Sequence, residues 1–110
     1  MKTSSAKSKG RRLQQYLRDQ LLSWAPDLQP DDIRSCSMGA GGEDLLLSPR
    51  AREVYPCSFE CKNTESISIW SSFKQAQDNA GSHIPVLCFS RNRSEPMVAM
   101  KLEDWLKLIR

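Results

Sequence analysis

Three segments of the chain carry apolar residues at the three-to-four-residue spacing of an amphipathic helix. The first follows residue 9 and ends before Pro26, the second covers residues 69–80 and ends at Gly81, and the third covers residues 102–109. The residues that recur at this spacing are Leu13, Tyr16, Leu17, Leu21 and Trp24 in the first segment; Ile69, Trp70, Phe73, Ala76 and Ala80, with the polar Gln77, in the second; and Leu102, Trp105, Leu106 and Ile109 in the third. We expect these faces to pack against a sheet.

The segments between the helices read as short strands. The expected strands cover residues 33–37, 44–47, 58–62, 85–90 and 97–100. Residues 85–90 are almost continuously apolar, which indicates a strand buried on both faces, and residues 91–94 read as the turn of a hairpin. Pro49 and Pro56 bound a connection and exclude a long helix there.

Side chains on the third strand alternate in character. Ser58, Glu60 and Lys62 share one face, expected to be wet and charged, while Phe59 and Cys61 share the other, apolar face. A further carboxylate, Asp44, leads into the preceding strand. Two carboxylates can hold a hard divalent cation, and a lysine beside them can contact the attacking water or the phosphate. This residue set suits a metal-dependent phosphodiesterase.

Asp44 followed by Glu60-Cys61-Lys62 resembles the D…(D/E)-x-K signature of the PD-(D/E)XK nuclease superfamily, and the Gly-x-Asp lead-in looks most like its small phage and archaeal Holliday-junction resolvase-like branch. The resemblance implies an α/β fold with a restriction-endonuclease-like core, a central mixed sheet flanked by helices. In that core the second and third strands pair as an antiparallel hairpin. It implies cleavage of DNA with Mg²⁺, for which Mn²⁺ is expected to substitute.

The same resemblance assigns roles to individual residues. Asp44, Glu60 and the backbone carbonyl of Cys61 would bind the metal, and Lys62 would be catalytic. Gln75 is the best match for a helical side chain that points back at the site. Family members often carry an acidic residue on the first helix, where this sequence has Gln14 and Gln15. A glutamine can position water or contact phosphate but supplies no charge, and a solvated polar face is an equally good interpretation.

Positive charge is concentrated at the N-terminus. Lys2, Lys7, Lys9, Arg11 and Arg12 precede any acid, which leaves 11 basic against 13 acidic residues in the rest of the 110-residue chain. We expect residues 1–10 to form a disordered basic arm and residues 11–110 to form one nuclease-like domain. The expected DNA-binding residues are Lys9, Arg11, Arg12, Ser37, Arg50, Arg52, Arg91 and Arg93. Each of them is also consistent with a solvated surface position.

Other chemistries fit less well. His83 is the only histidine, so a histidine-based metal site is excluded. The glycine-rich loop before Asp44 has neither the P-loop lysine nor G-x-G-x-x-G spacing, so no nucleotide cofactor is expected. The four cysteines are expected to be buried thiols rather than zinc ligands or disulfides.

The main alternative is a non-catalytic nucleic-acid-binding module on the same fold, because the first-helix acid is missing; a scaffold that binds other proteins is a third class. The resemblance implies DNA as a partner, with branched structures favoured, and a second copy of the chain in a homodimer. No apolar run is long enough for a membrane helix and no signal peptide is apparent. We therefore expect a cytoplasmic protein, in the host cytoplasm if a bacteriophage encodes it.

Overall fold

The computed structural model describes residues 2–36 and 43–110, so Ser37, one of the expected DNA-binding residues, lies outside the described part. The chain is a mixed α/β protein, as the sequence predicts. Its elements are α1 (Lys2–Ser23), the 3-10 helix η1 (Pro30–Asp32), β1 (Ile33–Ser35), β2 (Leu45–Leu47), α2 (Pro49–Val54), β3 (Cys57–Asn63), α3 (Ile69–Ala80), β4 (Ile84–Ser90), β5 (Met97–Ala99) and α4 (Leu102–Leu108).

The first helix is longer than expected. α1 begins at Lys2, so the segment expected to be a disordered arm is helical. Residues 2–9 contain no proline, and adding a turn to an existing helix costs far less free energy than starting one. Leu13 is buried against the sheet, but Trp24, placed in the apolar stripe by its spacing, is 81% exposed.

The strands form two separate sheets, one of two strands and one of three, with a different pairing from that implied by the resemblance. β1 and β2 pair antiparallel, while β3 and β4 pair parallel and β4 and β5 antiparallel. The expected hairpin of β2 with β3 is absent from the described residues, in which one backbone bond, from Asp44 N–H to the Phe59 carbonyl at 2.9 Å, joins their edges. The physical reason is α2: this short helix fills the connection between the strands, and its Arg52 side chain takes the Cys57 carbonyl.

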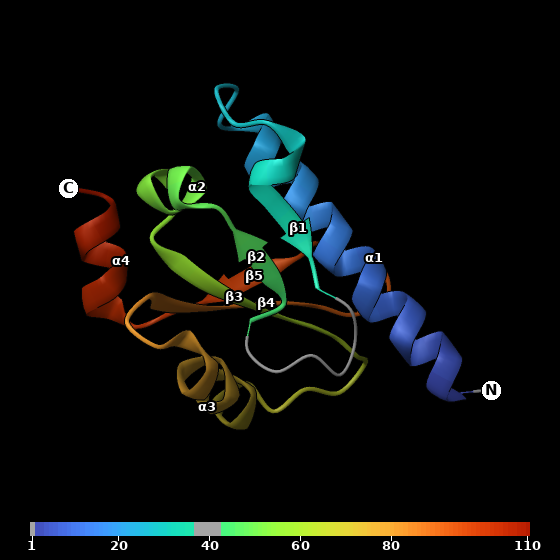
Figure 1. Ribbon diagram of the computed structural model, residues 1–110. Helices are drawn as coiled ribbons and strands as arrows, with labels where there is room; N and C mark the ends of the chain where they lie inside the picture. Colours follow the sequence, from blue (N-terminus) through green and yellow to red (C-terminus); the bar gives the residue numbers. More distant parts are fainter. Residues whose placement is uncertain (1, 37–42) are drawn as a thin grey trace.

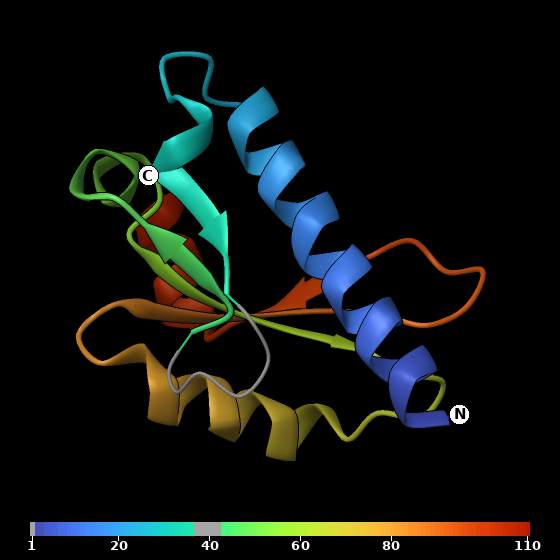
Figure 2. The same cartoon turned by 45° about the vertical axis from the view of Figure 1, so that its right-hand side comes forward.

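Helices cover both faces of the three-stranded sheet, with α1 on one side and α3 on the other (Figures 1 and 2). Phe59 packs with Ile33 and Leu45 in the main core, and Cys61 packs with Leu13 of α1. The opposite face of β3 was expected to be wet, but Ser58 and Glu60 are buried on it as well. Because parallel β3 and β4 are joined through α3, that helix must lie over the sheet.

The predicted helix over residues 69–80 is confirmed, and Gly81 follows it with a positive φ of 59°. Its inner face carries the small residues Ser72, Ala76 and Ala80, which let the helix approach the sheet closely. Trp70, expected on this face, is 87% exposed instead.

The hairpin after β4 and the last helix form as predicted, but the apolar face of α4 does not cap the sheet. Leu102, Trp105, Leu106 and Ile109 are all exposed, and Asp104 is the buried residue of this helix. In the described part of the chain, none of the helices combines the length and the apolar character needed to cross a membrane.

Candidate active site

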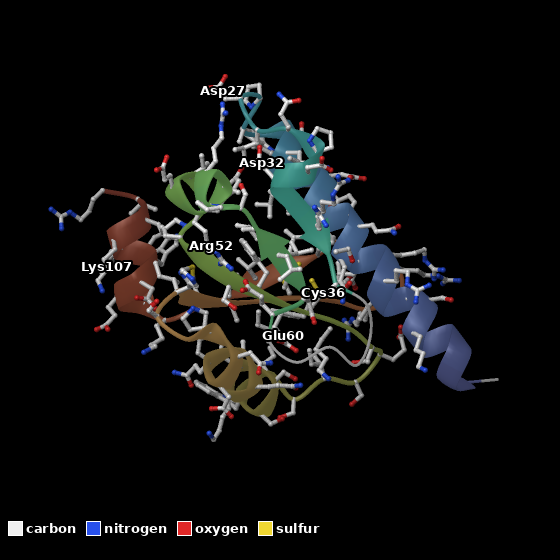
Figure 3. All side chains as sticks on the ribbon, in the orientation of Figure 1. Asp27, Asp32, Cys36, Arg52, Glu60 and Lys107 are labelled. Carbon is white, nitrogen blue, oxygen red and sulfur yellow. The ribbon has the colours of Figure 1, made fainter. Side chains whose placement is uncertain are left out.

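β3 and α3 together position Glu60 and Lys62. In the parallel ladder Glu60 is opposite Leu87 and Lys62 is opposite Phe89, with all four side chains on the face that α3 covers. Glu60 is buried, with only 7% of its surface accessible to solvent, and lies between β3 and α3 (Figure 3). Lys62 is two residues nearer the end of the strand and is half-buried.

Asp44 is held against the free edge of β3 by its backbone and its side chain. Its N–H donates to the Phe59 carbonyl at 2.9 Å, and its Oδ2 accepts from the Cys61 N–H at 2.7 Å. Its own carbonyl accepts from Cys36 N–H at 2.8 Å. These bonds bring Asp44 to the strand that carries Glu60 although 15 residues separate the two in sequence.

The Cys61 carbonyl faces the same edge. The N–H and C=O of one strand residue point to the same side of the strand, and the Cys61 N–H points to Asp44. The Pro56 carbonyl accepts from Ile84 N–H, so the backbone groups of every second residue from Pro56 onward point toward β4. The backbone groups of the residues between them, Cys61 included, point to the opposite edge of β3. The Cys61 carbonyl and Asp44 therefore lie at the same edge of β3, next to Glu60 in the strand.

Electrostatics show that the three charged side chains interact. Burial raises the pKa of Asp44, and the adjacent positive charge of Lys62 partly opposes the increase. Burial, and then the negative charge of Asp44, raise the pKa of Glu60, while Asn79 and Lys62 favour its ionised form. Two partly desolvated carboxylates that repel each other are suited to sharing a cation.

Asn79 is a site residue that the sequence did not reveal. Its Nδ2 donates to Glu60 Oε1 at 3.3 Å from the last turn of α3. Gln75, the expected helical residue, is exposed one turn earlier on the same flank. α3 runs opposite to β3, so Gln75 lies toward the Lys62 end of the site. Asn79 differs from the other amide side chains of α3 only in where the packing of α3 on β3 places it, and the sequence does not encode this packing locally.

The two glutamines of α1 differ in environment. Gln14 is buried, and its Oε1 accepts a hydrogen bond of 2.6 Å from Ser35 Oγ. Ser35 pairs with Leu45, the residue after Asp44, so Gln14 lies in the layer next to the site. Gln15 is exposed. The interpretation of these glutamines as a solvated polar face therefore holds for Gln15 but not for Gln14.

The arginines of α2 have internal partners. Arg52 Nη2 pairs with Glu43 Oε2 at 2.5 Å, and Arg52 Nη1 donates to the Cys57 carbonyl. The second Glu43 oxygen, Oε1, is buried without a partner among the described residues. Arg50 reaches the Asp27 carbonyl at 3.1 Å, in the loop after α1. This placement gives Arg52 a structural role next to Asp44 and points Arg50 elsewhere.

The other expected DNA-binding residues lie in two places. Arg11 and Arg12 are exposed on α1, and the Lys9 carbonyl accepts from Asn63 Nδ2 at 3.2 Å, which ties α1 to the end of β3. Arg91 and Arg93 are exposed in the hairpin after β4. Because β3 and β4 are parallel, Lys9 and this hairpin lie at the same end of the sheet as Lys62.

The donors around Asp44 fit a hard cation. Carboxylate and carbonyl oxygens suit Mg²⁺, which is commonly bound through one or two carboxylates and keeps several waters. Within residues 2–36 and 43–110, no group of three or more His, Cys, Asp and Glu side chains is placed to hold a metal. A site here would consist of two carboxylates and one carbonyl. All four cysteines were expected to be buried thiols, but only Cys57, Cys61 and Cys88 are buried, and Cys36 is half-buried. Burial raises the pKa of Cys57 to about 11.

Comparison with family models, with curated proteins and with solved structures finds no match for this chain. The PD-(D/E)XK resemblance therefore rests on the residues themselves.

Proposed function

We propose that this chain is a metal-dependent endodeoxyribonuclease of the PD-(D/E)XK type. The observation that carries the proposal is the bond from Cys61 N–H to Asp44 Oδ2, which joins Asp44 to the strand of Glu60 and Lys62. The chain order α1, β1, β2, α2, β3, α3 and β4, with a crossover helix between parallel β3 and β4, supports a restriction-endonuclease-like core. The separation of β2 from β3 is the feature of this chain that departs from that arrangement.

In the proposed mechanism Asp44, Glu60 and the Cys61 carbonyl would hold Mg²⁺, or Mn²⁺ in its place. When bound, the cation polarises the phosphate and lowers the pKa of a coordinated water. Lys62 orients the attacking water and stabilises the charge that develops on the phosphate oxygens. Asn79 positions Glu60 through its hydrogen bond. Gln75, one turn earlier on α3, would contact the substrate phosphate or the attacking water from the Lys62 end of the site.

DNA is the proposed substrate, and structure-selective cleavage of a resolvase-like kind is favoured over sequence reading. Lys9, Arg91 and Arg93 surround the end of the sheet that carries Lys62, where they would contact phosphates on either side of the cut. A homodimer acting in the cytoplasm completes the proposal. Sedimentation velocity tests the dimer, which should dissociate on dilution.

A non-catalytic DNA-binding module is the second candidate. It is favoured by Gln14, which is buried beside the site where family members often have an acid. In this case the basic residues would bind DNA with a strong salt dependence, but no strand would be cut.

The deciding experiment incubates labelled four-way junction, flap and linear duplex DNA with the protein in Mg²⁺, Mn²⁺ or EDTA. Glu60→Gln is the test variant, and Glu53→Gln, an exposed residue of α2, is the matched control. The proposal expects metal-dependent cleavage by the wild type and by Glu53→Gln, and none by Glu60→Gln. If the proteins bind DNA but none of them cuts it, the binding module is supported. If they neither bind nor cut DNA, both candidate functions are rejected.

A further inference from the structure

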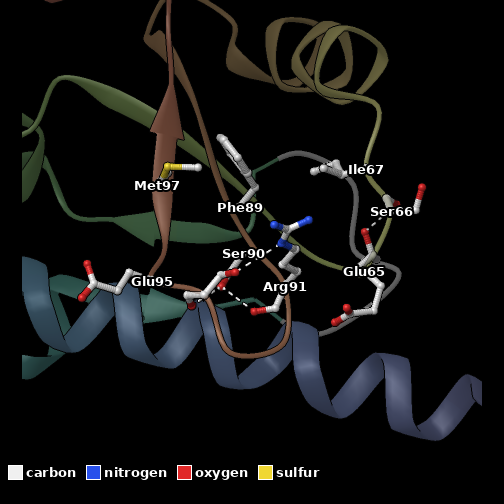
Figure 4. Close-up of a pocket in the computed structure, with 10 residues that line it drawn as sticks. Glu65, Ser66, Ile67, Phe89, Ser90, Arg91, Glu95 and Met97 are labelled. Carbon is white, nitrogen blue, oxygen red and sulfur yellow. Dashed lines mark hydrogen bonds between the residues drawn. The ribbon is translucent and has the colours of Figure 1, made fainter.

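A pocket of about 420 Å³ opens at the end of the sheet beside the candidate active site (Figure 4). It lies between the loop from β3 to α3 and the hairpin from β4 to β5. Its lining includes Thr64, Ser66, Ile67, Phe89, Arg91 and Met97. Two carboxylates, Glu65 and the exposed Glu95, also line it. The carboxyl ends of parallel strands are where open α/β sheets usually bind ligands.

The pocket shares its floor with the catalytic strand. Phe89 is opposite Lys62 in the β3–β4 ladder and opposite Met97 in the β4–β5 ladder. Paired side chains in a sheet point to the same face, and adjacent strands are roughly 4.8 Å apart. Phe89 is thus the immediate neighbour of Lys62, and this pairing places the pocket one strand away from the Lys62 end of the candidate site.

Hydrogen bonds fix the two walls relative to each other. Thr64 N–H donates to the Ser90 carbonyl at 3.2 Å, and Asn92 N–H donates to Glu65 Oε2 at 2.6 Å. The Glu65 carboxylate therefore has a partner within the protein. The pocket is a formed feature of the fold rather than a gap between independent loops.

The chemistry of the lining suits one planar aromatic ligand with an attached anion. Phe89, Met97 and Ile67 provide apolar surface, and Figure 4 shows the Arg91 guanidinium between Phe89 and Ile67. Arg91 is anchored through Nε to Ser94 Oγ at 3.2 Å, which leaves its terminal nitrogens for a phosphate. The Ser66 hydroxyl adds a group able to bond a base edge, and the Thr64 hydroxyl, which donates to the Ser66 carbonyl at 2.9 Å, can still accept a bond. The volume is near the lower end of the range for ligand pockets.

We propose that this pocket takes one unpaired nucleobase of the DNA, stacked on Phe89, from a nucleotide next to the phosphate at Lys62. Arg91 contacts the phosphate that flanks this nucleotide. The inference rests on the proposed function and deepens it, because it names the feature of the DNA that is selected. A base that is paired within a duplex cannot enter the pocket, whereas an unpaired base can. Selection of branched or unpaired DNA then comes from this pocket rather than from base-specific contacts.

The test measures binding by the Glu60→Gln protein to two duplexes that carry a single-nucleotide bulge. In one the bulged residue keeps its base, and in the other it is abasic, so the backbone is the same. The proposal expects about 5- to 150-fold tighter binding to the bulge that has a base, the range for stacking of one base on an aromatic side chain. Equal affinity for the two duplexes overturns it.

Variants then locate the effect. Phe89→Leu keeps an apolar side chain but removes the aromatic ring, and should abolish the preference. If this variant melts early, Met97→Ala is used instead, with Val98→Ala as its control. Met97 and Val98 are neighbours on β5, 58% and 56% exposed, but point to opposite faces. Met97→Ala should reduce the preference and Val98→Ala should retain it; equal effects of the two overturn the proposal.

A competition arm separates DNA from free nucleotide. Deoxyadenosine monophosphate at 1 mM should displace little of the bulged DNA. Strong displacement combined with equal binding of the two bulges would identify a free-nucleotide pocket and overturn the proposal. Failure of the nuclease itself is distinguishable, since the wild type would then cut no DNA with any metal.

Discussion

Asp44 Oδ2 accepts a hydrogen bond from the Cys61 backbone N–H at 2.7 Å, and this contact joins two carboxylates that come from separate ladders. Asp44 precedes β2, while Glu60 lies on β3, and the two strands do not form a ladder in the described residues. This side-chain bond, together with the backbone bond from Asp44 N–H to the Phe59 carbonyl, takes the place of strand pairing between β2 and β3.

Replacing Glu60 by Gln should stabilise the metal-free protein near neutral pH. The pKa of folded Glu60 is raised, chiefly by burial, so its ionised form opposes folding. Glutamine removes that charge and can still accept the hydrogen bond from Asn79. We expect a gain on the order of 1 kcal/mol, or roughly 4–8 °C in Tm, measured by circular dichroism melting in EDTA.

The gain should depend on pH. Between about 4.3, the ordinary pKa of an unfolded glutamate, and the higher pKa in the folded protein, the folded state binds the extra proton. Wild-type stability therefore falls as the pH rises through this window, and the advantage of Glu60→Gln should disappear below pH 4. An advantage of the same size at pH 3.5 and pH 8 would show that burial of the charge is not its cause. Mg²⁺ should stabilise the wild type but not the variant.

Asn79→Ala should reduce cleavage by about 10-fold through loss of the hydrogen bond that orients Glu60. Gln77→Ala, an exposed amide on the same helix, is the control and should cleave normally. The Mg²⁺ concentration required for half-maximal cleavage should rise for Asn79→Ala alone. A loss of rate with unchanged Mg²⁺ dependence would assign Asn79 a role other than positioning the proposed ligand.

Arg52→Ala should lower the free energy of unfolding by about 3 kcal/mol, because it leaves the Glu43 carboxylate with little access to water and without its partner. Arg50→Ala, two residues away and exposed, should change it by less than about 0.5 kcal/mol. Urea unfolding measures both. If Arg52 instead serves DNA directly, its variant should keep normal stability and lose salt-sensitive DNA affinity. The double variant Arg52→Met with Glu43→Gln should recover most of the stability.

Ser35→Ala should destabilise the protein by about 1–3 kcal/mol, since the buried Gln14 Oε1 would lose its donor. Ser23→Ala, at the exposed end of α1, is the matched control and should be nearly neutral. Thermal melting of the two variants gives the comparison. Similar melting temperatures would mean that water replaces Ser35 at Gln14, and that Gln14 is more accessible than its burial indicates.

The elements of this protein were largely predictable, because their signals are local. The helix of residues 69–80 and the hairpin after β4 follow from spacing and turn residues that act within a few positions of one another. Alternation along β3 likewise placed Glu60 and Lys62 on one face. The prediction that this face is exposed to water was wrong, because α3 covers it. The path of α3 across the sheet cannot be read from the sequence of β3.

The sequence by itself determined the α/β class, the helix at residues 69–80, the buried strand β4 and the common face of Glu60 and Lys62. Tertiary structure alone decided that Asp44 reaches β3 through a side-chain bond, that Asn79 rather than Gln75 contacts Glu60, and that Phe89 lies beside Lys62. The periods of helices and strands are fixed by the geometry of one segment. Contacts between segments depend on pairing, register and the direction of the crossover, which no single segment encodes.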